Sequence, residues 1–195
     1  MSDRIAPTVA GPWPDGIAAT RLELTRYLDD IGSGALDALP TRCVPWTVRD
    51  ITIHLTETFR RFGKMLDQGR RGDFTPPFAQ DELDAENLRA VAAFRGHPSI
   101  ELVAAVTGFL DAIVDLDEPV PHQFGTLPVG LQVLFGLMDI VMHHDDVLAA
   151  DGRSYRPSSD ALGALTVVGE RLFGMPPDQD DPWLVMLTGA GRPPS

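Results

Sequence analysis

The sequence has one cysteine and no apolar run long enough to cross a membrane. Cys43 has no second cysteine with which to form an internal disulfide, which fits a reducing compartment. No uninterrupted apolar segment approaches the roughly 20 residues that span a bilayer. Residues 1–14 carry prolines and charges where a secretory signal peptide needs an apolar core. We therefore expect a cytoplasmic protein without a membrane span.

Basic side chains are also few. The 195 residues include 16 lysines and arginines against 28 aspartates and glutamates, which gives a formal net charge of −12 at pH 7. A field of this sign repels the phosphates of nucleic acids and of anionic lipids. Neither is expected as a partner.

Apolar residues recur at helical spacing along most of the chain, and prolines and glycines gather between these segments. The pattern predicts an all-α fold, a bundle of four long helices with shorter ones, and such bundles commonly hold metal sites between facing helices. The expected helices cover residues 16–38, 47–68, 81–95, 100–115, 129–150 and 158–173. A proline-bearing connector is expected over 115–128, and a short strand or extended segment over 182–189.

These elements are expected to form one domain over residues 16–189, since single domains commonly contain about 100 to 200 residues. Residues 1–15 are expected as a lead-in and residues 190–195 as a short tail. No internal repeat is visible.

The expected helix over 129–150 carries a stripe of potential metal ligands. Asp139 and His143 are four residues apart and therefore lie about 40° apart around the helix axis. Asp146 falls on the same stripe, whereas His144 lies off it and is expected as a flanking residue. A carboxylate and an imidazole on adjacent turns offer two ligand atoms to one divalent ion.

His54, beside the apolar stripe of the expected helix over 47–68, can supply a third ligand. Three protein ligands leave one position open for water, substrate or a thiolate, as in catalytic zinc sites. Asp146 is expected to hydrogen-bond the unused ring nitrogen of a ligating histidine, or to act nearby as a base. Glu57, three residues after His54, is a spare candidate ligand or base.

A plainer interpretation of the same residues stays open. An inward histidine is usually a hydrogen-bonded core group, and an aspartate four residues before a histidine is often a simple helix-face pair. Burying Asp139 alone would cost several kcal/mol, a cost that a metal, an arginine or a lysine removes. Cys43 is interpreted as a small buried apolar side chain.

Two segments together resemble the DinB-like superfamily and, within it, the mycothiol-dependent maleylpyruvate isomerase N-terminal group. The first is the run WTVRDITIHL over 46–55. The second is the pattern D-x-x-x-H-x-x-D over 139–146, followed by AADG over 149–152. With the closing LTG over 187–189, the similarity covers residues 16–189.

The resemblance implies a DinB-like four-helix bundle with additional short helices that binds a divalent metal, typically zinc with nickel as an alternative. Its ligands are then His54, Asp139 and His143, although the acid of the family is usually glutamate. The resemblance also implies a low-molecular-weight thiol, mycothiol, whose sulfur approaches the metal and becomes a nucleophile.

The activity that follows is that of a thiol-dependent transferase or isomerase acting on a small electrophilic substrate. The alternative is a non-catalytic metal-binding or stress-response module on the same bundle. A homodimer is an expectation compatible with both.

Overall fold

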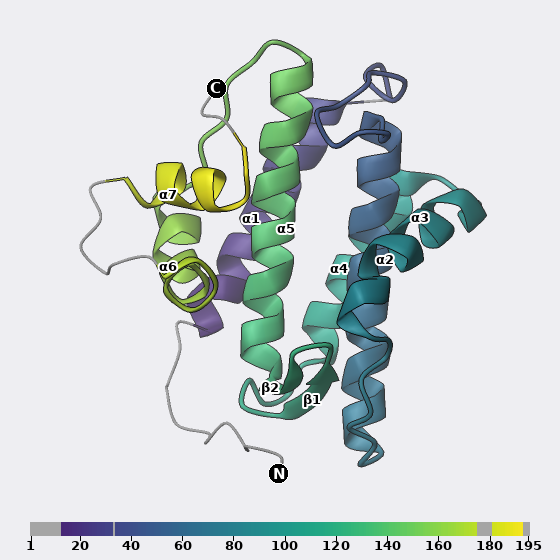
Figure 1. Cartoon of the computed structure of the whole chain (residues 1–195), viewed down its shortest axis with the longest axis vertical. Helices are drawn as coiled ribbons and strands as arrows, with labels where there is room; N and C mark the ends of the chain where they lie inside the picture. The colour runs from purple at the N-terminus through teal and green to yellow at the C-terminus, as the bar shows by residue number, and fades with distance from the viewer. Residues whose placement is uncertain (1–12, 33, 175–180, 193–195) are drawn as a thin grey trace. The chain divides into compact units, whose positions relative to one another are not determined.

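The fold is mostly α-helical. It was obtained as a computed structural model that describes residues 13–32, 34–174 and 181–192 (Figure 1). The helices are α1 (Trp13–Ile31), α2 (Val48–Arg70), α3 (Leu83–Ala93), α4 (Pro98–Ala112), α5 (Val129–Ala150), α6 (Ser159–Phe173) and α7 (Pro182–Gly189). A short 3-10 helix, Gln80–Glu82, precedes α3, and strands β1 (Pro119–His122) and β2 (Gly125–Pro128) form an antiparallel pair. The expected all-α class is confirmed, with one small hairpin added.

The described residues form two compact units. The first unit, residues 52–132, contains most of α2, then α3, α4 and the hairpin. The second unit, residues 13–51 and 133–192, contains α1, the loop that leads into α2, most of α5, α6 and α7. No helix in the described ranges has both the length and the apolar character of a membrane span.

The predicted start of α2 is confirmed by a capping box. The backbone N–H of Thr47 donates to Asp50 Oδ2 at 3.0 Å, and the N–H of Asp50 donates to Thr47 Oγ1 at 3.3 Å. Aspartate thus replaces the usual glutamate of this motif. In the first unit, α2 then packs Phe59 and Phe62 against Phe109 of α4, with ring centroids 6.1 and 5.6 Å apart.

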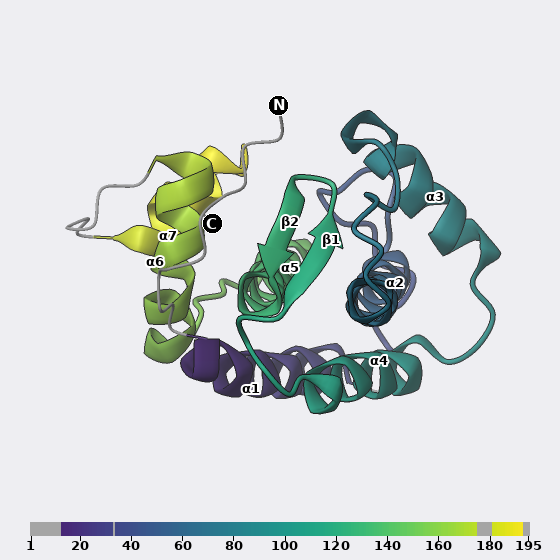
Figure 2. The same cartoon turned by 90° about the horizontal axis from the view of Figure 1, so that it is seen from below.

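The expectation of an irregular connector over 115–128 is wrong in part, because residues 119–128 form the β1–β2 hairpin (Figure 2). Its prolines are tolerated because both strands of a two-stranded sheet are edges, where a missing N–H leaves no ladder bond unmade. Val120 and Leu127 pair across the hairpin and are buried. At Gly69 of α2, an added Cβ would lie 2.6 Å from the carbonyl oxygen of Pro119, so only glycine lets the hairpin approach.

His122 in this hairpin should make stability depend on pH. Burial, together with the positive charge of Arg61, lowers the pKa of His122 to about 4, and its Nδ1 accepts from the N–H of Phe124 at 3.3 Å. Between about pH 6.5 and 4 the unfolded chain takes up a proton that the folded chain refuses, so stability falls as the pH falls. The loss reaches on the order of 3 kcal/mol near pH 4.

Urea unfolding at pH 7 and pH 4.5 checks this expectation. His122→Asn should lose less stability on acidification than the wild-type protein, whereas His97→Asn, at an exposed position, should match the wild type. Equal pH dependence of the wild type and His122→Asn would contradict it.

In the second unit, Glu23 joins α1 to the start of α6. This fully buried carboxylate accepts from the hydroxyl of Tyr155 at 2.6 Å, from the N–H of Ser158 at 2.8 Å and from Arg26 at 2.9 Å. Ser158 in turn caps α6, as predicted, by accepting from the N–H of Ala161. One buried acid therefore joins α1 to the residues that lead into α6.

Both expected boundaries of the first helix and the expected type of the last element are corrected. α1 begins at Trp13, inside the expected lead-in, and ends at Ile31 because Gly32 adopts a positive φ of 60°. Residues 182–189 form helix α7 rather than a strand, since the Asp181 carboxylate accepts from the N–H groups of Trp183 and Leu184 and Pro182 takes the first helical position. The other lead-in and tail residues, 1–12 and 193–195, lie outside the described residues.

Candidate functional site

The predicted stripe of polar residues is present on α5, whose bounds match the expected helix. His143 is buried, with 8% of its surface exposed, and Asp146 is fully buried. Asp139 is only half-buried, which corrects the expectation of a buried acid at that position. The fully buried carboxylates of α5 are instead Asp145 and Asp146.

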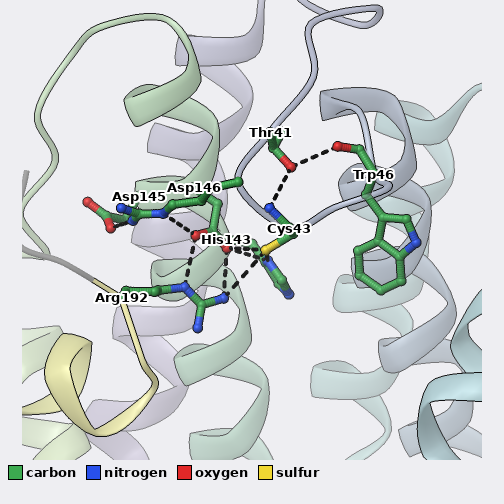
Figure 3. Close-up of polar contacts among 8 residues, drawn as sticks. Thr41, Cys43, Trp46, His143, Asp145, Asp146 and Arg192 are labelled. Carbon is green, nitrogen blue, oxygen red and sulfur yellow. Dashed lines mark hydrogen bonds and ion pairs between the residues drawn. The ribbon is translucent and has the colours of Figure 1, made fainter.

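His143 and Asp146 form the hydrogen bond that the sequence predicts for a ligating histidine. His143 Nδ1 lies 2.9 Å from Asp146 Oδ2 (Figure 3). An ionised carboxylate only accepts, so Nδ1 donates the proton of this bond. The same arrangement holds metal-ligating imidazoles in one tautomer and one orientation.

Asp146 is itself held by two arginines. Arg192, which follows α7, donates from Nε to Oδ1 and from Nη2 to Oδ2, both at 2.8 Å. Arg42, in the loop before α2, donates from Nε to Oδ1 at 2.7 Å and from Nη2 to Asp145. The sequence pattern does not connect either arginine with α5, because Arg42 is 104 residues and Arg192 is 46 residues from Asp146 along the chain.

Cys43 also belongs to this cluster, which corrects its interpretation as an apolar filler. Its thiol donates to Asp146 Oδ2 at 2.9 Å, and its sulfur lies 3.9 Å from His143 Nδ1 and 3.7 Å from Arg192 Nη2 (Figure 3). The loop is held in place by Thr41, which accepts from the N–H of Cys43 and donates to the carbonyl of Trp46. A polar cluster formed by tertiary contacts leaves no periodic signal in the sequence.

The sulfur of Cys43, a nitrogen of His143 and an oxygen of Asp146 lie within 4.8 Å of one another, a spacing at which they could share a metal. Two guanidinium groups already occupy the oxygens of Asp146 and place positive charge beside any cation there. Cys43 and Asp146 are therefore better suited to orient His143 than to bind a metal ion.

The charges of the cluster are strongly coupled. Burial alone would raise the pKa of Asp146, but the hydrogen bonds from Arg192 and His143 hold that pKa far below its usual value. Burial alone would lower the pKa of His143, but its bonds to Asp146 and Cys43 and the charge of Asp139 raise that pKa to about 9. A metal bound at Nε2 would have to compete with a proton for that nitrogen.

His54 and Glu57 lie on α2 in the first unit. His54 is buried, with 7% of its surface exposed, as expected for an inward histidine. Glu57 accepts from Arg60 at 2.6 Å, and Arg60 also pairs with Glu101, so this spare candidate is already engaged in a surface ion pair. Their roles as ligands remain predictions.

His144 lies off the His143 stripe, as predicted, but it is fully buried and not a flanking residue. Its Nε2 is 2.9 Å from Asp30 Oδ2, and its ring packs 4.1 Å from that of Tyr155 and 5.5 Å from that of Tyr27, between centroids. Burial lowers the pKa of His144 to about 4. It belongs to the polar contacts that join α5 to α1.

Comparison with known proteins gives one finding. A family model described as the mycothiol maleylpyruvate isomerase N-terminal domain matches residues 17–148. The match includes His54, Asp139, His143 and Asp146, whereas Arg192 lies beyond it. No curated protein and no solved structure matches the chain.

Proposed function

Since the chain belongs to the mycothiol maleylpyruvate isomerase N-terminal domain family, within the DinB-like superfamily, we propose that it is a metal-dependent, thiol-using enzyme. The metal is a divalent ion, zinc first and nickel as the alternative. The thiol is mycothiol or a similar small thiol, and the second substrate is a small electrophile. The reaction class is thiol-dependent transfer or isomerisation.

The observation that carries the proposal is the bond between His143 Nδ1 and Asp146. It commits one ring nitrogen to a buried carboxylate, which is how proteins orient ligating imidazoles, and we propose that the other nitrogen, Nε2, binds the ion. Asp139, one turn earlier on α5, supplies a carboxylate oxygen. We propose His54 of α2 as the third ligand, so that a fourth position stays open.

A metal bound there would lower the pKa of a coordinated thiol and make it a nucleophile at neutral pH. Asp146 contributes by orienting His143. The alternative role of base does not suit it, because a carboxylate whose pKa lies far below its usual value accepts protons poorly at neutral pH. The hydrogen bonds from Arg192 and His143 keep that carboxylate ionised.

Metal titration tests the ligand set. Protein freed of metal by a chelator should bind one equivalent of zinc or nickel in calorimetric titrations. Asp139→Asn, which keeps the size of the side chain but removes its charge, should weaken zinc binding by at least about 10-fold, because it weakens a direct ligand. Asp139→Glu, with the usual acid of the family, should retain binding. No stoichiometric binding of zinc, nickel or manganese by the wild-type protein would overturn the proposal.

Thermal unfolding tests the thiol. Mycothiol, or a simple thiol analogue, should raise the melting temperature only when the metal is present, because a ligand that binds the folded state stabilises it. Metal binding without a response to any thiol would instead favour the non-catalytic module.

A further inference from the structure

Arg192 lies directly after α7, in a segment whose backbone is hydrogen-bonded to the last turn of that helix. The N–H of Ala190 donates to the carbonyl of Met186 at 3.0 Å, and the N–H of Arg192 donates to that of Leu187 at 2.8 Å. Between them Gly191 adopts a positive φ of 71°, the conformation that ends helices in this way. Residues 190–192 are therefore turned back by backbone bonds, which place Arg192 beside α5.

The guanidinium of Arg192 holds both oxygens of Asp146. Its two parallel bonds, Nε to Oδ1 and Nη2 to Oδ2, form the bidentate pair that fixes the plane of a carboxylate. Arg42 donates to Asp146 from Nε alone, at Oδ1, and its Nη2 donates to Asp145. The oxygen that accepts from His143 is Oδ2, which also accepts from Nη2 of Arg192, whereas Arg42 binds Oδ1.

We infer that Arg192 is a positioning residue for the metal site. Arg192 orients the His143 imidazole through the carboxylate of Asp146. Its consequence for metal affinity rests on the proposed function, in which Nε2 of His143 binds the metal. The orientation of the His143 ring sets the direction in which Nε2 points. The structural part of the inference depends only on the second unit, to which all three residues belong. It also assigns a role in the site to a residue beyond the family segment 17–148.

Nuclear magnetic resonance of the metal-free full chain tests the structural part. In the wild-type protein the Nδ1 proton of His143 should give a hydrogen-bonded, slowly exchanging signal. Arg192→Ala should broaden or shift that signal, and Arg192→Lys should not restore it, because an ammonium cannot bind two carboxylate oxygens in parallel. Added methylguanidinium should restore the signal in Arg192→Ala.

The matched control is Arg153→Ala. Arg153 also forms an ion pair in the second unit, with Asp30, but it does not contact Asp146. This variant should leave the His143 signal unchanged and disturb that of His144, which shares Asp30. If Arg192→Ala left the His143 signal as in the wild type, or if Arg153→Ala changed it equally, the inference would be wrong. Arg192→Lys provides the same comparison if the alanine variant fails to fold.

Zinc titration tests the consequence. Arg192→Ala should lower zinc affinity by about 10-fold, at the lower end of the effect of residues that support ligands, and methylguanidinium should recover it. Unchanged affinity with an altered His143 signal would overturn the metal-site role. If the wild-type protein bound no zinc, the proposed function would fail, and the His143 signal would still decide whether Arg192 positions the ring.

Discussion

Replacing His143 with alanine is expected to abolish stoichiometric zinc binding, with a loss of affinity greater than the roughly 10- to 100-fold caused by changes to supporting residues. The variant removes a side chain that lies one turn from Asp139 on α5 and is hydrogen-bonded to Asp146. The metal content of the purified protein and calorimetric titration of the metal-free protein measure the effect.

His144→Gln is the matched control on the same helix. His144 is as deeply buried as His143, but its Nε2 is directed to Asp30. We expect this variant to be less stable and to bind one equivalent of zinc. Unchanged metal content in His143→Ala, or equal loss in both variants, would contradict the assignment of His143.

Replacing Glu23 with alanine is expected to lower the free energy of unfolding by about 3 kcal/mol, because one buried and one half-buried donor lose their acceptor at about 1–3 kcal/mol each. These donors are the hydroxyl of Tyr155 and the N–H of Ser158. Arg26, which is partly exposed, can turn to solvent and adds little. Urea unfolding at neutral pH, followed by circular dichroism, measures the loss.

Two variants show whether the loss comes from this buried contact. Glu23→Gln keeps an acceptor and should lose less stability than Glu23→Ala. Glu86→Ala removes an exposed acid paired with Arg89 and should change stability by less than about 0.5 kcal/mol. Similar losses in Glu23→Ala and Glu86→Ala would show that Glu23 does not join α1 to α6 as described.

The elements predicted correctly are those whose signals are local. α5 begins after Pro128 and ends at Ala150, as its continuous apolar pattern predicts, and α2 begins directly after the capping residue Thr47. The hairpin and α7 were missed for a different reason. Prolines predicted irregular structure over 115–128, although a two-stranded sheet tolerates them, and the apolar residues of α7 obscured its cap at Asp181.

In the candidate site, too, contacts within one helix were predictable from the sequence and contacts between distant segments were not. The bond between His143 and Asp146 was predictable because residues three apart meet on one face of a helix. Arg42, Cys43 and Arg192 were not, since they reach α5 from a loop and from the segment after α7. Each is held there by backbone or side-chain bonds of its own segment, which a periodicity argument does not detect.

The central claim is that His143 belongs to a metal site that binds a thiol. Its most direct test is the absorption spectrum of cobalt(II)-substituted protein during the addition of mycothiol. The experiment uses the Cys43→Ser variant, in which the added thiol is the only source of thiolate. We predict a new sulfur-to-cobalt charge-transfer band that saturates at one equivalent and is absent when His143 is also replaced by alanine. Stoichiometric cobalt binding with no such band, or no cobalt binding, would contradict the claim.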